Sequence, residues 1–247
     1  MKNSKHLSFI EHLAELRSRI LRLLVIYALT FCACYYFSDE LYYVIAKPLI
    51  EILGDKTHFI YTNLAEGFFT QINLAAKFAF LIILPVIAFQ IYFFIEPGLY
   101  KSERKLIKLL IISSPLLFFL GVIFVYFFVM PKAFEFFISF QKTGLPYNLS
   151  LEAKINEYVS LVISLVFAFG IAFQLPVIIL ILVSLKLIKA ESLRLYRRFA
   201  ILAIFIIAGI ITPPDVISQL LLAFPLMGLY ELTIIIAKNI ESRRENA

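Results

Sequence analysis

The stretch FAFLIILPVIAFQIYFFI, Phe78 to Ile95, contains no charged residue. As a helix, its 18 residues would extend about 27 Å, close to the ~30 Å thickness of a bilayer hydrocarbon core. Comparable apolar runs extend over Leu21 to Phe37, Leu109 to Val129 and Val159 to Leu185. Strands of a membrane barrel would be shorter and would alternate polar with apolar residues. The sequence therefore predicts an all-α integral membrane protein.

The composition points the same way. Of the 247 residues, 62% are hydrophobic and 16% are charged, whereas a soluble domain has roughly 45–50% apolar and ~25% charged residues. The N-terminus is charged, and no small-residue cleavage site follows the first apolar run, so we expect that run to remain in the membrane. Cys32 and Cys34 are two positions apart and would point about 200° apart on a helix, so we interpret both as small apolar residues.

The apolar pattern predicts one domain over residues 1–247 with six spans, approximately 20–37, 72–95, 107–129, 158–182, 199–211 and 216–237. The basic residues predict its orientation. Four segments on one side (1–22, 96–108, 183–198 and 238–247) hold 17 of the 23 lysines and arginines. By the positive-inside rule, both termini are expected in the cytoplasm.

The connections differ on the two sides. The segments Ser38 to Gln71 and Met130 to Glu157 are long and apolar enough to form interfacial helices, and we expect them to build a cap on the outer face. Only sixteen residues separate Arg198 from Asp215, about 24 Å of helix, so the bilayer is expected to be thin beside the last two spans. The turn TPPD, Thr212 to Asp215, connects them.

Several functional classes are disfavoured. The sequence has no GxxxxGK[ST] phosphate-binding motif and no HExxH, and its three histidines lie outside the predicted spans. We therefore expect no enzyme activity, no metal and no cofactor. The net charge of +6 follows from the membrane topology and needs no nucleic-acid partner.

The N-terminal stretch SFIEHLAELRSRI, Ser8 to Ile20, predicts an amphipathic helix leading into the first span. Two interpretations of its charges remain open. Glu15 can pair with Arg19 one turn later while the basic residues anchor the helix at the interface. Alternatively, Glu15 and Glu103 can each hold one guanidinium of a ligand with two adjacent arginines. Arg104 could also neutralise Glu103 locally.

Polar residues in the predicted spans are candidate partner contacts or pathways. Asp215 can equally be the N-cap of the last helix, and Glu231 can extend to the interface beside Lys238. The set comprises Gln90, Gln174, Asp215, Gln219 and Glu231.

Four motifs together resemble the TatC proteins of the twin-arginine translocase: SFIEHLAELRSR, IEPGLYKSER, AFGIAFQLP and TPPDVISQLLLAFPLMGLYE. They occur in the order and spacing of that family and cover essentially the whole chain. The resemblance implies a curved, glove-like bundle of six helices in the bacterial inner membrane. It also implies recognition of twin-arginine signal peptides, association with the single-span proteins TatA and TatB, and export of folded proteins by the proton-motive force.

The resemblance assigns residues to two sites. For signal-peptide binding it implies Glu15 and Glu103 as the acids that contact the arginines, with Arg17, Arg19, Phe94, Leu99 and Tyr100 around them. For partner docking or translocation it implies Pro48, Gln174, Asp215 and Gln219. One departure is Gln174, where the family usually has glutamate; an amide can hydrogen-bond a partner helix but cannot ionise. Membrane lipid and further copies of the chain are the other expected partners.

Two rival hypotheses come from other classes. A secondary transporter of a small solute would show inverted repeats and a charged site in the membrane centre. Three prolines do interrupt predicted spans (Pro85, Pro115 and Pro176), but the sequence has no second half that repeats this pattern symmetrically. A scaffold would assemble partners without binding signal peptides. Peptide binding distinguishes the receptor from both alternatives.

Overall fold

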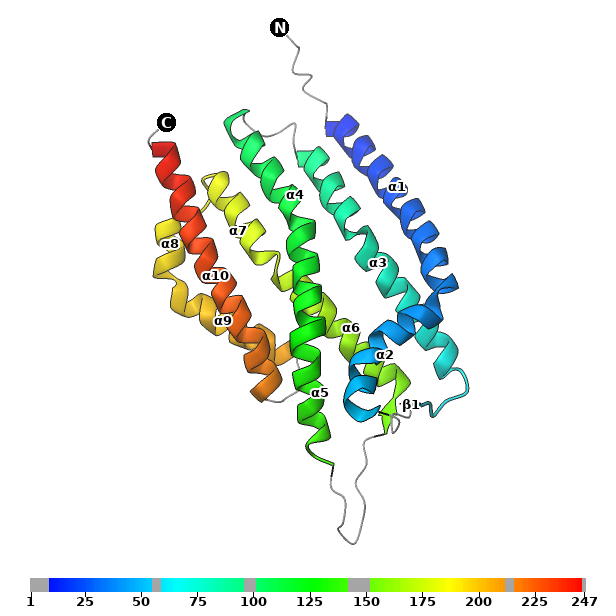
Figure 1. Cartoon of the computed structure of the whole chain (residues 1–247). Helices are drawn as coiled ribbons and strands as arrows, with labels where there is room; N and C mark the ends of the chain where they lie inside the picture. The colour runs from blue at the N-terminus through cyan, green and yellow to red at the C-terminus, as the bar shows by residue number, and fades with distance from the viewer. Residues whose placement is uncertain (1–8, 55–58, 96–100, 142–151, 212–215, 246–247) are drawn as a thin grey trace.

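The structure is a computed structural model that describes residues 9–54, 59–95, 101–141, 152–211 and 216–245 (Figure 1). At a few helix ends it describes the backbone but not every side chain. The described chain is almost entirely helical. Its elements are α1 (Phe9–Tyr36), α2 (Ser38–Leu53), β1 (Phe59–Ile60), α3 (Glu66–Ile95), α4 (Lys101–Phe124), the π-helical turn η3 (Val125–Val129), α5 (Met130–Ile138), β2 (Ala153–Lys154), α6 (Ile155–Ala172), α7 (Leu175–Ser184), α8 (Ala190–Leu195), α9 (Arg197–Ile211) and α10 (Val216–Glu245).

Within the described residues, five helical stretches are long and apolar enough to cross a membrane. They confirm an all-α, multi-pass membrane protein. The predicted span 199–211 corresponds to α9, which has only 15 residues, or about 22 Å. This length is too short to cross an ordinary hydrocarbon core, so α9 is not among the five stretches that are long enough to do so.

The helices extend beyond one predicted span and divide another into two. The third span was expected to end at 129, but the helix continues through η3 and α5 to Ile138. It continues because Met130, Ala133 and Phe134 lie on one face of α5 and are buried in the core. The predicted span 158–182 is broken into α6 and α7, since Pro176 has no N–H to donate to the carbonyl one turn earlier.

The predicted cap on the outer face is formed by α2, α5 and the paired strands. β1 and β2 are parallel, with Phe59 opposite Ala153 and Ile60 opposite Lys154. Tyr158 anchors α2, because its hydroxyl donates to the carbonyl oxygen of Ile45 at 2.8 Å. The cap lies at the opposite end of the bundle from the beginning of α1 and the end of α10 (Figure 1).

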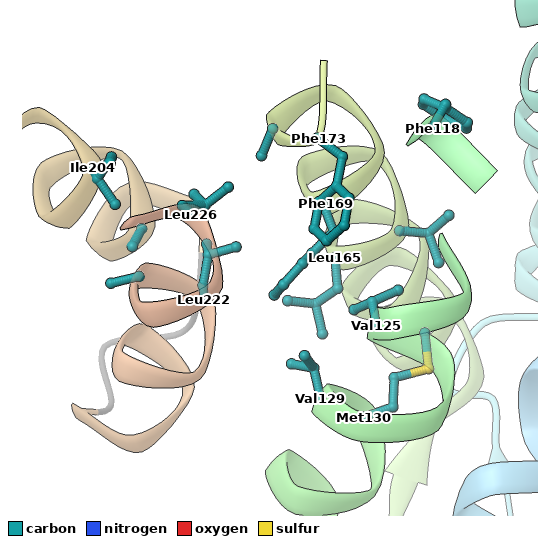
Figure 2. Packing of buried hydrophobic residues seen from close by; sticks show 14 of the residues in the cluster. Phe118, Val125, Val129, Met130, Leu165, Phe169, Phe173, Ile204, Leu222 and Leu226 are labelled. Atoms are coloured by element: carbon teal, nitrogen blue, oxygen red, sulfur yellow. The ribbon is translucent and has the colours of Figure 1, made fainter. Parts of the chain in front are cut away.

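The core is centred on α6. Figure 2 shows its side chains between those of α10 and those of the η3–α5 segment; the labelled set includes Val125, Val129, Met130, Leu165, Phe169, Phe173, Leu222 and Leu226. Helix α4 approaches α6 closely at Gly170, where an added Cβ would lie 2.3 Å from Cε2 of Phe118. A glycine is required there by the ring, which is itself 2% exposed.

Candidate functional site

At one end of the bundle, α1 and α4 begin and α3 and α10 end (Figure 1). We call this end the inner face, because the distribution of basic residues predicts that it faces the cytoplasm. Helix α1 packs along α3. Helix α4 begins six positions after the last residue of α3, with residues 96–100 between them. The predicted signal-peptide residues on α1, α3 and α4 therefore belong to three neighbouring helix ends.

Arg19 joins α1 to α3 at this face. Its Nε donates to Oε1 of Glu15 at 3.1 Å, and its Nη2 donates to the same oxygen. Its Nη1 donates to Oε1 of Gln90 at 2.9 Å, and its Nη2 also reaches the carbonyl oxygen of Phe93 at 3.3 Å. The guanidinium thus binds its own helix and α3 at once.

Glu15 accepts two hydrogen bonds from Arg19 at this face. The Glu15–Arg19 pair expected from spacing is present, and the two side chains are 30% and 15% exposed. Because Arg19 also donates to α3, its charge is shared between the carboxylate and two neutral oxygens.

Arg17 lies on a different face of α1 from the Glu15–Arg19 pair. It is exposed and lines a shallow surface groove with Ser18 and Arg22, whose Nη2 donates to Oγ of Ser18 at 3.3 Å. Phe94 is half-buried on the last turn of α3. The structure therefore brings Glu15, Arg19 and the end of α3 together, and it separates Arg17 from them.

Three predicted site residues, Leu99, Tyr100 and Asp215, lie outside the described residues. Glu103 lies on the first turn of α4, and its backbone is described but its side chain is not.

Gln174 lies at the break between α6 and α7 and is bound inside the protein. Oγ of Ser114 donates to its Oε1, and its Nε2 donates to the carbonyl oxygen of Ser114, each at 2.9 Å. The interaction joins the break to α4 beside Pro115. This position therefore has a structural partner within the chain, which the sequence alone did not reveal.

The other predicted docking residues lie on α2 and α10. Pro48 is buried within α2 in the cap. Gln219 on the first turns of α10 donates through Nε2 to the carbonyl oxygen of Phe205 on α9 at 3.0 Å. Gly209 permits this approach, since a Cβ there would lie 3.0 Å from the same Nε2.

Sequence reasoning missed a second contact between α9 and α10. Glu231, expected beside Lys238, instead forms an ion pair with Arg197 at the start of α9. The hydrogen bond that Arg197 donates to Glu231, followed by the charge of Glu231, raises the pKa of Arg197. No periodic signal connects residues this far apart, although an acid within an apolar span was a reason to look for a partner.

Comparisons with known proteins agree with this architecture. The family model described as "Sec-independent protein translocase protein (TatC)" matches residues 11–225. The protein of that name from Rickettsia prowazekii (strain Madrid E) is 51% identical over 238 residues, covering 96% of this chain and 95% of the relative. Its counterpart from Escherichia coli (strain K12) is 37% identical over 229 residues, covering 93% and 87%. The crystal structure titled "Twin Arginine Translocase Receptor- TatC" superimposes with a TM-score of 0.77 at 35% identity, covering 92% of this chain and 98% of that one.

Proposed function

This chain belongs to the TatC family of Sec-independent protein translocase proteins, and from that premise we propose that its inner face binds the twin-arginine signal peptides of exported proteins. Glu15 and Glu103 hold the two guanidiniums. Phe94, Leu99 and Tyr100 contribute the surrounding surface, whereas Arg17, which is exposed on another face of α1, lies outside it. The chain acts as the receptor and core subunit in the cytoplasmic membrane, where transport of folded cargo is driven by the proton-motive force.

The observation that carries the proposal is the contact of Arg19 with α3. By donating to Gln90 and to the carbonyl oxygen of Phe93, Arg19 holds Glu15 at the α1–α3 junction. The neighbouring first turn of α4 carries the second acid, Glu103. Two carboxylates on separate helix ends suit two adjacent arginines, because each can accept a bidentate guanidinium.

Arg19 itself is assigned a positioning role. It is bound to Glu15 and to two acceptors on α3, so it does not offer a free cation to a ligand. Its pair with Glu15 holds that carboxylate in place near anionic lipid headgroups, which compete for arginines at the membrane surface.

The direct test is binding of a twin-arginine signal peptide to the detergent-purified protein. Glu15→Ala and Glu103→Ala should each weaken binding more than tenfold, about 1.4 kcal/mol. A twin-lysine peptide should bind the unsubstituted protein more weakly, since an ammonium cannot form a bidentate pair. Glu51→Ala provides a control, because Glu51 is an exposed acid of the cap paired with Lys47 at 3.8 Å.

Equal binding of both peptides to all four proteins would contradict the receptor assignment. In that case the inner-face charges are interfacial anchors. Intact assembly with partner proteins would then favour the scaffold hypothesis, and solute uptake by the reconstituted chain alone would favour the transporter.

A second part of the proposal concerns the partner proteins. We propose that the single-span proteins TatA and TatB dock beside α9 and α10, at the region of Asp215 and Gln219. Gln219 already binds the backbone of α9, and it is half-buried, so its amide group has a neighbour in the chain and access to the surface. The short α9 supports thinning of the bilayer at this docking region.

The experiment for docking is site-specific cross-linking from Gln219 replaced by a photoreactive residue, in membranes that contain TatA and TatB. Cross-links to either partner from position 219, and none from Leu116, which is 69% exposed on α4, are expected. Equal cross-linking from both positions would contradict a defined docking region.

A further inference from the structure

Helices α3 and α6 run side by side from the outer face inward, and two contacts delimit one section of the seam between them (Figure 1). At the outer end, the backbone N–H of Asn156 contacts the carboxylate of Glu66. Further in, the rings of Phe80 and Phe167 lie 5.7 Å apart between centroids. The section between these contacts has polar side chains on both helices.

On α3 the polar side chains are Asn73 and Lys77, which follow Glu66 by seven and eleven positions. At 100° per residue, these three residues and Phe80 fall within about 60° of one another. Because Glu66 and Phe80 both contact α6, the two polar residues between them lie on the same side of α3.

On α6 the corresponding side chains are Ser160 and Ser164, four and eight positions after Asn156. Together with Asn156 and Phe167 they fall within about 80° around the helix. They therefore border the same seam from the other side. Val162, Ile163 and Val166 face instead toward Phe78 and Leu81, around a separate apolar cavity of about 200 Å³.

The polar side chains of the seam are accessible and without partners. Asn73 and Ser164 are exposed, and Lys77 and Ser160 are half-buried. Among the residues that the structure describes, none of the four makes a side-chain hydrogen bond or ion pair. Four unpaired polar groups, one of them a cation, would be costly against hydrocarbon.

Lys77 lies deep in the membrane section of its helix. The apolar stretch of α3 extends over Glu66–Phe94, so Lys77 is three residues, about 4.5 Å, from its midpoint. Charged residues at such depth face protein partners or water. Helical side chains tilt toward the helix N-terminus, which for α3 is the outer face, and a lysine extends its ammonium along that direction to reach water.

We propose that the seam between α3 and α6, from Glu66 and Asn156 down to Phe80 and Phe167, is a water-filled crevice that opens to the outer face. The Lys77 ammonium lies near its floor, and the two phenyl rings close it below. The crevice admits small hydrophilic solutes into the membrane section of the protein, and near its floor, away from the Glu66 carboxylate at its mouth, the Lys77 charge favours anions over cations. This property is independent of signal-peptide recognition on the inner face.

The crevice can be tested by thiol labelling from outside intact cells. Both native cysteines are first replaced by alanine, and then single cysteines are introduced as Lys77→Cys, Ser164→Cys and Ile82→Cys. Ile82 is the control because it is 50% exposed on the same helix but not on the polar stripe. A membrane-impermeant methanethiosulfonate, which forms a mixed disulfide with a thiolate and releases methanesulfinate, should label positions 77 and 164 at least tenfold faster than position 82.

The charge is tested by comparing anionic and cationic reagents at Ser164→Cys. The rate of each reagent at Ser164→Cys is divided by its rate with a free thiol in solution. With Lys77 present, this ratio should be at least fivefold higher for the anionic reagent than for the cationic one, and Lys77→Met should abolish the difference. Adding Ser160→Leu should slow labelling at Lys77→Cys by filling the seam. The crevice would be overturned if positions 77 and 164 were labelled no faster than position 82, in variants that elute as the unsubstituted protein does. The role of the ammonium would be overturned if the reagent preference were unchanged in Lys77→Met.

Discussion

Ser114 and Gln174 hold each other by two reciprocal hydrogen bonds, each 2.9 Å long, across the interface between α4 and the α6–α7 break. Each side chain lies next to a proline-disturbed section of helix, with Pro115 following one and Pro176 following the other closely. The pair therefore connects two helices at the points where their own backbone hydrogen bonding is interrupted.

Gln174→Leu should lower the free energy of unfolding by about 1–2 kcal/mol, because interhelical hydrogen bonds in membranes contribute about 0.6 kcal/mol on average and up to ~1.7. Unfolding by SDS in mixed micelles, followed by circular dichroism, measures the change. In a double-mutant cycle with Ser114→Ala, a coupling energy of about 0.6 kcal/mol or more is expected. Additive effects of the two substitutions would show that the bond from Ser114 Oγ contributes nothing, because Ser114→Ala leaves in place the carbonyl oxygen that accepts from Gln174 Nε2.

Gly170→Ala should destabilise the protein by about 1–3 kcal/mol, the usual cost of forcing extra atoms into a packed core, because its Cβ would overlap the ring of Phe118. The same substitution at Gly228, which has open space around it, is the matched control and should be neutral or slightly stabilising. Phe118→Leu in the Gly170→Ala background should recover part of the loss. An equal effect at both glycines would mean that helix propensity, not contact with Phe118, sets the result.

Gln90→Leu should weaken binding of a twin-arginine peptide about three- to tenfold, or ~0.7–1.4 kcal/mol. Without the amide oxygen, Arg19 loses one of its acceptors on α3, so its guanidinium is held more by Glu15 and competes more strongly with the incoming arginine. Isothermal titration of the purified variant measures the change, and Gln219→Leu, an amide on α10, is the control. A stronger interaction in Gln90→Leu would contradict the positioning role of Arg19.

Reversing one charge of the Arg197–Glu231 pair, as in Glu231→Arg, should lower the Tm, whereas the exchange Arg197→Glu with Glu231→Arg should restore most of the loss. The gain is expected to be small and to decrease with salt because both side chains are partly exposed. The raised pKa of Arg197 favours the folded state wherever arginine is protonated in the folded protein, so this contribution persists through neutral and mildly alkaline pH. A double variant no more stable than Glu231→Arg alone would contradict the pair.

The sequence predicted the helices well because their signal is local. Uninterrupted apolar length identifies a membrane helix; α3 ends at Ile95 and α9 at Ile211, and the predicted turns at Pro97 and TPPD lie outside the described residues. The sequence predicted that Pro176 interrupts its span but not how completely, because a proline in a membrane helix is compatible with either a kink or a full interruption. Which one occurs depends on whether neighbours such as Ser114 satisfy the polar groups at the break.

The candidate site was predictable only in part. The Glu15–Arg19 pair follows from a spacing of four residues, but the bond from Arg19 to Gln90 joins positions 71 apart. Its existence depends on the rotation and height of α1 relative to α3, which apolar patterns define only loosely. The contact of Arg197 with Glu231 was hidden for the same reason, and the family resemblance supplied roles for these residues without supplying their partners.

The π-helical turn Val125–Val129 joins α4 and α5 into one continuous rod. Because such a turn holds more residues than an α-helical turn, it shifts the phase of the apolar pattern, and Met130 and Phe134 reach the core where a regular helix would have carried them past it. Removing one residue from this turn would rotate α5 by about 100° relative to α4 and would turn the cap's apolar face away from α6. The turn thus lets the membrane bundle and its outer cap each keep their own angular register along a single helix.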